Sequence, residues 1–238
     1  MLRSLYSEIA GGDFISALIL LLSYAALILL MLPVHEWAHA FAANKLGDDT
    51  AKWNGRLTLN PLKHLDLFGT LMLVLCGFGY ARPVPVNPHN FKNPKRDMAL
   101  TALAGPVSNL LMAALSLVIF RVVLLVAGTP LVISGGYIYC DSEFIGYLFV
   151  MLVNVFAGIN ITLAAFNLLP LHPLDGSRIF AAILPDGWTR WLERNQMIVM
   201  LVLVALLFSG ALDVPLNYLR MGVGWLLCTP LGLPNYFA

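Results

Sequence analysis

The chain has 238 residues, of which 59% are hydrophobic and only 11% are charged, with a formal net charge of +1. A soluble domain usually carries about 25% charged residues, so this composition leaves too little charge to cover a water-facing surface. The mean hydropathy of +0.81 agrees, and we expect an integral membrane protein rather than a soluble one. The nearly balanced charge gives no sign of a nucleic-acid partner. The three cysteines have no CxxC spacing, so neither a disulfide framework nor a thiolate zinc site is predicted.

The first predicted span begins at Phe14 and runs as one helix to about Lys45 (14–45). Its residues 14–34 are 21 consecutive uncharged positions, enough to cross a bilayer. Because this run is longer than a signal-peptide core and leads directly into a polar motif, we expect it to stay in the protein rather than be cleaved. Pro33 is predicted to kink the helix or to free a carbonyl near its end.

The polar motif is an HExxH sequence, His35-Glu36-Trp37-Ala38-His39, at the end of the span. Residues four apart lie on one face of a helix, so His35 and His39 can share one metal ion. Glu36 then lies beside the ion, where it can act as general base on a bound water. A catalytic zinc ion has three protein ligands and one open position, so the motif predicts a third ligand elsewhere in the chain.

The chain around 55–90 is predicted to associate with the membrane without crossing it. Residues 67–81 are apolar, but they number only 15 and are interrupted by glycine, which favours a re-entrant or interfacial segment over a span. Residues 82–88 contain three prolines, which favour an extended or β conformation.

Three further spans are predicted, at about 98–121, 144–171 and 196–213. With the first span they make an all-α polytopic membrane protein of about four transmembrane helices, and we expect 1–238 to form a single membrane-embedded domain. The apolar remainder 214–238 is broken by glycine and proline, so that a crossing and a position on the membrane surface both stay open.

The basic residues predict the orientation of these spans. Eleven of the fourteen Lys and Arg residues fall in two stretches, 45–96 and 178–194. If 67–81 does not cross, both stretches lie on one side of the membrane, which the positive-inside rule makes the cytoplasmic side. We therefore expect a multi-pass protein of the cell membrane with both termini outside and the HExxH motif toward the cytoplasm.

The third ligand is predicted to be Asp175, at the end of the third span. The first and third spans run in the same direction, so Asp175 arrives at the same depth as His35 and His39. Gly176 beside it removes side-chain bulk. Ionisable residues at membrane depth are costly and are therefore functional candidates.

With Asp175, the HExxH motif resembles the site-2 protease family of intramembrane zinc metalloproteases, in its compact prokaryotic branch. The matching segments cover roughly residues 14–185. They are His35-Glu36-Trp37-Ala38-His39, Gly55 to Pro61 (GRLTLNP), Arg82 to Pro88 (RPVPVNP), Ala104-Gly105-Pro106 with Asn109, and Asn167 to Gly176 (NLLPLHPLDG).

The resemblance implies an enzyme that cleaves transmembrane protein substrates in the lipid bilayer, as in regulated intramembrane proteolysis. It implies one Zn²⁺ ion per chain bound by His35, His39 and Asp175, with Glu36 as the catalytic base. It also implies that Asn167 is a polar catalytic group near the reacting carbonyl. The chain is too short for the PDZ or CBS domains of other branches, so we expect neither.

Several residues keep an alternative role. Asn167 can instead hydrogen-bond a neighbouring helix, and Asn109 is expected to be structural rather than catalytic. His172 stands where the family commonly has an apolar residue or proline, and its imidazole can support a ligand, replace one, or do neither. His64 and His89 lie in polar stretches and are expected to face water.

Two other classes of function compete with proteolysis. A metal-ion transporter also carries histidines in membrane helices, but it predicts several ligand sets along a path through the bilayer, whereas these ligands cluster at one depth. A catalytically silent zinc scaffold that binds membrane partners has no need of a base such as Glu36.

Overall fold

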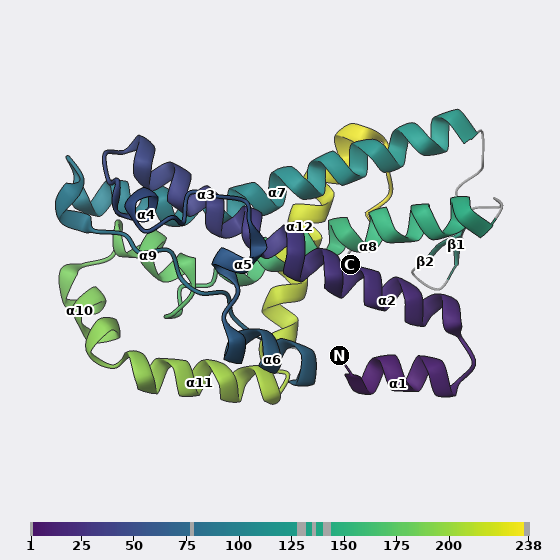
Figure 1. Cartoon of the computed structure of the whole chain (residues 1–238), viewed down its shortest axis with the longest axis horizontal. Helices are drawn as coiled ribbons and strands as arrows, with labels where there is room; N and C mark the ends of the chain where they lie inside the picture. Colours follow the sequence, from purple (N-terminus) through teal and green to yellow (C-terminus); the bar gives the residue numbers. More distant parts are fainter. Residues whose placement is uncertain (1, 77–78, 128–131, 135–136, 140–143, 236–238) are drawn as a thin grey trace.

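The computed structural model of the chain describes residues 2–76, 79–127, 132–134, 137–139 and 144–235. Helices make up about three quarters of this part, and three of them are long and apolar enough to cross a membrane: Phe14–Lys45, Pro94–Val126 and Phe149–Asn167. The expected all-α polytopic membrane fold is confirmed (Figure 1).

The elements follow one another as α1 (Leu2–Ala10), α2 (Phe14–Ala26), a π-helix (Leu27–Met31), α3 (Leu32–Lys45), α4 (Thr50–Trp53), α5 (Pro61–His64), α6 (Leu67–Cys76), a 3₁₀ turn (Pro88–Asn90), α7 (Pro94–Ala127), β1 (Val132–Ser134), β2 (Tyr137–Tyr139), α8 (Phe144–Asn167), α9 (Asp175–Ala181), α10 (Asp186–Arg194), α11 (Gln196–Phe208), α12 (Asp213–Cys228) and a 3₁₀ turn (Thr229–Leu231). The strands β1 and β2 form a short antiparallel hairpin.

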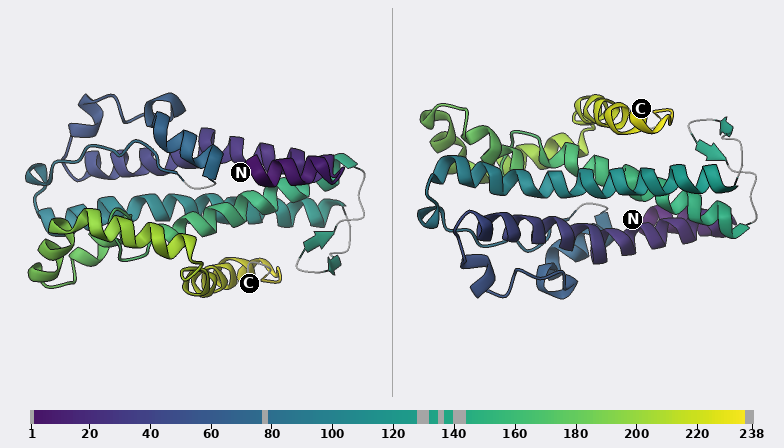
Figure 2. Two further views of the ribbon diagram at one scale, coloured as in Figure 1. Left: turned by 90° about the horizontal axis from the view of Figure 1, so that it is seen from below. Right: turned by 90° about the horizontal axis from the view of Figure 1, so that it is seen from above.

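Three long helical segments form the centre of the molecule. In Figure 1, the α2–α3 segment and α8 run in the same direction along the long axis, and α7 runs in the opposite direction. The first and third spans are therefore parallel. Figure 2 shows α4, α5 and α6 on one side of these helices and α10, α11 and α12 on the other.

Small residues let α7 and α8 pack closely. Ala113 of α7 and Ala157 of α8 are fully buried in one cluster with Leu117 and Ile161. In a bilayer, small side chains at a helix interface allow the backbones to approach. Cys228 of α12 belongs to the same cluster, so the C-terminal helix packs on this pair.

The break expected at Pro33 takes the form of a π-helical turn. Residues Leu27–Met31 are wound as a π-helix, and the N–H of Leu32 bonds to the carbonyl of Leu27. Pro33 has no N–H to donate, and its ring crowds the carbonyl four residues earlier. A wider turn directly before the proline accommodates both effects, so the span continues as one helical segment into the HExxH motif.

The segment around 55–90 packs against the first span, with Leu73 of α6 on the π-helix and Val84 on α3. Helix α6 has ten residues, about 15 Å of helix, which is half the thickness of a hydrocarbon core and too short to span it. Residues 79–87 form neither helix nor a paired strand within the described chain, and Asn87 has extended backbone angles. Val84 packs instead with Ala40 and Ala51 in a buried cluster, which ties the extended chain to α3.

The fourth span differs from the expected 196–213. Helix α11 ends at Phe208, and α12 begins at Asp213 after a bend of 82°. The two helices together have the shape of a broken span or a re-entrant loop. The third span also ends early, at Asn167 rather than 171, because Pro170 lacks a backbone donor and disfavours helix in the residue before it.

Candidate metal centre

Helix α3 places the two histidines of the motif on its buried face. His35 and His39 are 6% and 8% exposed, and their Nε2 atoms lie 3.1 Å apart. The rings meet edge to face at an angle of 86°. One turn of helix thus brings two nitrogen atoms to a single point inside the protein.

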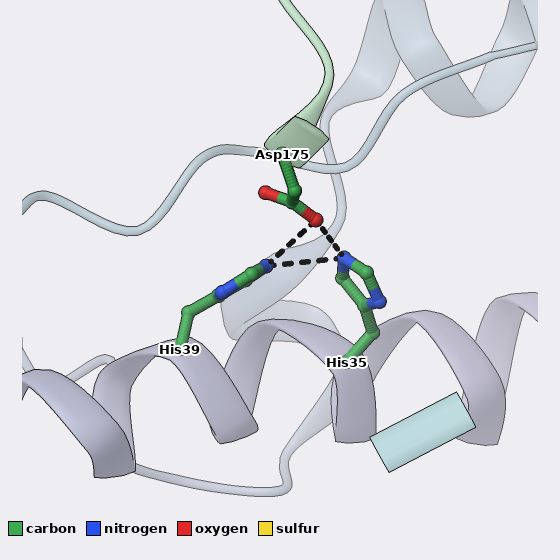
Figure 3. Close-up of side chains that lie close together, drawn as sticks. All are labelled: His35, His39 and Asp175. Atoms are coloured by element: carbon green, nitrogen blue, oxygen red, sulfur yellow. Dashed lines mark hydrogen bonds and ion pairs between the residues drawn. The ribbon is translucent and has the colours of Figure 1, made fainter. Parts of the chain in front are cut away.

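The carboxylate of Asp175 completes this point. Its Oδ2 lies 3.1 Å from Nε2 of His35 and 3.3 Å from Nε2 of His39 (Figure 3). Asp175 is the first residue of α9, which follows α8 after a short loop. Because α8 runs parallel to α3 (Figure 1), this loop places α9 beside α3 and so brings the aspartate to the histidines.

Gly176 makes the tight turn after α8 possible. A Cβ at this position would lie 2.5 Å from the carbonyl oxygen of Leu168 and closer still to that of Leu169. No side chain fits there, since these atoms belong to the backbone. The small residue beside Asp175 thus allows α9 to fold against the end of α8, and this places the carboxylate.

Helix α7 contacts the outer side of both imidazole rings. Nδ1 of His39 lies 2.8 Å from the backbone carbonyl oxygen of Thr101, and Nδ1 of His35 lies 3.3 Å from Oδ1 of Asn109. A carbonyl oxygen only accepts hydrogen bonds, so each Nδ1 carries a proton, and in the neutral ring that binds a metal the lone pair is then on Nε2. Both lone pairs then face Asp175.

Gly105 leaves the space in which a metal ion fits. A Cβ on Gly105 would lie 2.6 Å from Cε1 of His35 and closer still to Nε2 of His39. The missing side chain therefore opens a cradle at the meeting point of the three ligand atoms.

The donor set and the distances suit zinc. Ligand atoms about 2.0–2.2 Å from a tetrahedral zinc ion lie roughly 3.3–3.5 Å from one another, close to the separations among the three atoms here. Oδ2 of Asp175 is also buried and receives no hydrogen bond within the described part of the chain. In that part, His35, His39 and Asp175 are the one group of three or more His, Cys, Asp or Glu side chains arranged to hold a metal ion.

Glu36 lies next to these ligands and near a buried arginine. Arg56 as a whole is 5% exposed, and its Nη2 donates to the carbonyl of Arg82 in the extended segment. Burial lowers the pKa of Arg56, and the carboxylate of Glu36 is near enough to counteract part of that shift. Sequence reasoning did not single out Arg56, although it belongs to the matched GRLTLNP segment.

The remaining sequence candidates lie outside the cluster of three. Asn167 ends α8, and its Nδ2 donates to the carbonyl of Leu163 in the same helix. His172 is half-buried in the loop before Asp175. The expectation that His64 faces water is wrong: it is fully buried, with Nε2 2.6 Å from the carbonyl oxygen of Thr58. His89 is exposed, as expected.

Comparisons with known proteins point to one family. The family model of Peptidase family M50 matches residues 23–210. The chain is 46% identical over 154 residues to "Putative zinc metalloprotease YwhC" of Bacillus subtilis (strain 168), covering 65% of each chain. It is 30% identical over 191 residues to "Putative zinc metalloprotease Rip2" of Mycolicibacterium smegmatis, covering 78% of this chain and 66% of that one.

A Rip2 protein of Mycobacterium tuberculosis (strain ATCC 25618 / H37Rv) is 27% identical over 191 residues, with the same coverage. The matches thus span just under two thirds of the length of these relatives. No solved structure matches the chain. The apolar helices, the HExxH motif and the family match agree: this chain belongs to peptidase family M50, the site-2 protease family of zinc metalloproteases.

Proposed function

We propose that this chain is an intramembrane zinc metalloendopeptidase that hydrolyses peptide bonds in or near the transmembrane segments of membrane proteins. One Zn²⁺ ion per chain is held by His35, His39 and Asp175, and the whole of 1–238 acts as a single membrane-embedded protease domain. The observation that carries the proposal is the convergence of two Nε2 atoms and one carboxylate oxygen beside a long apolar helix.

Different residues of the chain have different roles in hydrolysis. Bound zinc lowers the pKa of a water molecule to about 7 and polarises the scissile carbonyl. Glu36 accepts the proton of the attacking water and passes it to the leaving amine. The amide of Asn167 lies near the developing oxyanion and stabilises it by a hydrogen bond. The amide nitrogen of Asn167 carries two hydrogens; one donates to the carbonyl of Leu163, and the other would serve the oxyanion.

The site faces the cytoplasm of the cell membrane in this proposal. Helices α4, α9 and α10, which carry basic residues of both stretches, lie at the same end of the bundle (Figure 1). The positive-inside rule assigns such an end to the cytoplasmic side. Water for hydrolysis reaches the zinc from there. Reaction of a membrane-impermeant thiol reagent with Lys52→Cys only in opened cells supports this orientation, and labelling in intact cells contradicts it.

An unwound substrate can pair with the extended chain at 79–87. A transmembrane helix hides its peptide bonds in its own hydrogen bonds, so it unwinds before it is cut. Extended chain can accept such a peptide as an added strand. The backbone groups of Arg82 and Asn87 already bond within the protein, so the peptide would pair between these two residues. Pro83 is exposed. A disulfide between Pro83→Cys and a cysteine near the substrate cleavage site tests this arrangement, and its absence over a scan of substrate positions contradicts it.

The central experiment compares wild type with Glu36→Gln. Both proteins are purified, their zinc content is measured, and each is incubated with a substrate that has one transmembrane helix. Zinc in both with cleavage by wild type alone supports a protease with Glu36 as base. Equal cleavage by both rejects the assignment, and zinc without cleavage by either favours a silent scaffold. Zinc transport into vesicles that depends on His35 favours the transporter.

A further inference from the structure

We propose that Asn109 is a positioning residue of the metal centre. Its side-chain oxygen holds the Nδ1 proton of His35 and so turns the Nε2 lone pair of that ring toward Asp175. The inference rests on the zinc site of the proposed function and adds a role for α7, which contributes none of the three ligands.

The two histidines are held on their outer sides in different ways. His39 has a backbone carbonyl within reach, that of Thr101 at 2.8 Å. For His35 the acceptor is a side chain, Oδ1 of Asn109 at 3.3 Å. The partner of His35 is therefore set by the residue type at position 109. An outer partner of this kind fixes the tautomer and the ring orientation of a ligating histidine.

The burial of Asn109 supports its side-chain oxygen as the hydrogen-bond acceptor for His35. The residue is fully buried, and its Nδ2 has no hydrogen-bond partner in the described part of the chain. An unpaired buried amide N–H destabilises the fold. An apolar residue of the same size would remove that cost, and it would also remove the acceptor for His35.

The opposite amide orientation does not suit a metal ligand. With Nδ2 toward His35, Nδ1 would become the acceptor and Nε2 would carry the proton. That proton would point at Asp175 and occupy the lone pair that binds zinc. The orientation with Oδ1 toward His35 is thus the one that leaves the site ready for the ion.

Gly105 allows Asn109 to reach the ring. Thr101, Gly105 and Asn109 follow one another at intervals of four residues, so they share one face of α7. Because Gly105 has no side chain, the backbone of α7 lies directly against both rings. The helix thus forms a wall that contacts the histidines over three successive positions.

The facing helix offers a matched control. Asn160 of α8 is also fully buried, its Nδ2 donates to the carbonyl of Phe156 in its own helix, and its Oδ1 is unpartnered among the described residues. It makes no described hydrogen bond to either histidine. Asn160→Leu therefore removes a buried amide of the same size near the same interface and leaves the metal centre untouched.

The test measures zinc affinity of the full chain in detergent by competition with a chromophoric chelator. Asn109→Leu should raise the Kd for zinc about 10–100-fold. Asn109→Asp, which keeps an oxygen at the same place, should stay within a few-fold of wild type, and Asn160→Leu should be unchanged. With cobalt in place of zinc, the visible absorption bands of Asn109→Leu should shift, while those of Asn160→Leu should not.

Three results would overturn the proposal. They are an unchanged Kd in Asn109→Leu, an equal loss of affinity in Asn160→Leu, and a loss in Asn109→Asp as large as that in Asn109→Leu. If Asn109→Leu does not fold, Asn109→Ala is judged by the same criteria. A wild-type protein that binds no zinc rejects the proposed function itself, which separates that failure from a failure of this inference.

Discussion

Oδ2 of Asp175 lies 3.1 Å from Nε2 of His35, although His35 lies in α3 and Asp175 lies far along the chain, at the start of α9. The contact closes the candidate zinc site, because it adds a carboxylate oxygen to two imidazole nitrogens. It depends on the parallel course of α3 and α8 and on the turn at Gly176. The position of this carboxylate is therefore the first property to test.

Replacement of Asp175 by alanine should abolish zinc binding under conditions in which wild type is saturated. Loss of an outer partner costs about 10–100-fold in metal affinity, and loss of a ligand costs more. Zinc content after dialysis measures the effect. Glu36→Gln is the control, since it should keep its zinc and lose only the base. A wild-type zinc content in Asp175→Ala would remove Asp175 from the ligand set.

Removal of the metal should stop cleavage and lower stability. A chelator such as 1,10-phenanthroline should abolish activity, and added zinc should restore it. A ligand at about 100 times its Kd stabilises the folded state by roughly 2.7 kcal/mol, so zinc should also raise the Tm of the stripped protein. The Asp175→Ala protein should show no such rise. Full activity of a zinc-free preparation would contradict the proposed chemistry.

The HExxH motif and Asp175 could be found from sequence for clear physical reasons. Helical periodicity puts His35 and His39 on one face. The first and third spans cross the membrane in the same direction, which brings Asp175 to the same level. Both arguments need only local spacing and chain direction. They do not depend on the details of packing.

The partners on α7 could not be found in this way. The contacts of Thr101 and Asn109 with the rings depend on how closely α7 approaches α3, which follows from the missing side chain of Gly105. The burial of His64 could not be predicted for a similar reason, because its polar sequence neighbours give no sign that the chain folds over it. The π-helical turn before Pro33 is likewise a local geometry that the proline alone does not specify.

Gly105→Ala should disrupt the metal centre more than its small size suggests. The added Cβ would lie 2.6 Å from Cε1 of His35 and nearer still to His39, so both rings would have to move. Zinc affinity and cleavage should both fall sharply. Gly222→Ala is the matched control: Gly222 lies in α12, and a Cβ there meets nothing within 4 Å. Equal behaviour of the two variants would show that α7 does not restrict the site.

Asp48 should control how firmly the chain at 87–90 is held to the end of α3. Its fully buried carboxylate accepts hydrogen bonds from the backbone and hydroxyl of Thr50, the backbone of Asn87 and the side chain of Asn90. Removal of such a charged acceptor costs about 1–3 kcal/mol. We expect Asp48→Asn to lower the Tm and keep its zinc. Asp213 is exposed, so Asp213→Asn should have little effect on the Tm.

The same carboxylate gives a pH dependence of defined sign. Burial alone would raise the pKa of Asp48, but the hydrogen bonds from Thr50, Asn90 and Asn87 outweigh it and hold the pKa below its ordinary value. Its contribution to stability is therefore complete above the unfolded-state pKa of about 3.9 and is lost as the pH falls through the lower folded-state value. The difference in Tm between wild type and Asp48→Asn should shrink below about pH 4. A difference that stays constant with pH would exclude this origin.

Arg56 should support the catalytic base without holding the metal. Its guanidinium joins the extended segment through the carbonyl of Arg82 and acts electrostatically on Glu36. Arg56→Gln removes the charge and the forked donor, and small displacements of catalytic groups cost up to about 100-fold in rate. We expect kcat to fall by roughly 10–100-fold with zinc content unchanged. Arg56→Lys, which keeps the charge, should fall less.

The exposed Lys52 of neighbouring α4 provides the control for this last change. Lys52→Gln also removes one positive charge from the same end of the molecule, but it lies on the surface, where solvent and salt screen its field. Its kcat should equal that of wild type. Loss of zinc from Arg56→Gln would instead assign Arg56 to the stability of the whole site. A wild-type kcat in Arg56→Gln would show that Glu36 works without a buried cation beside it.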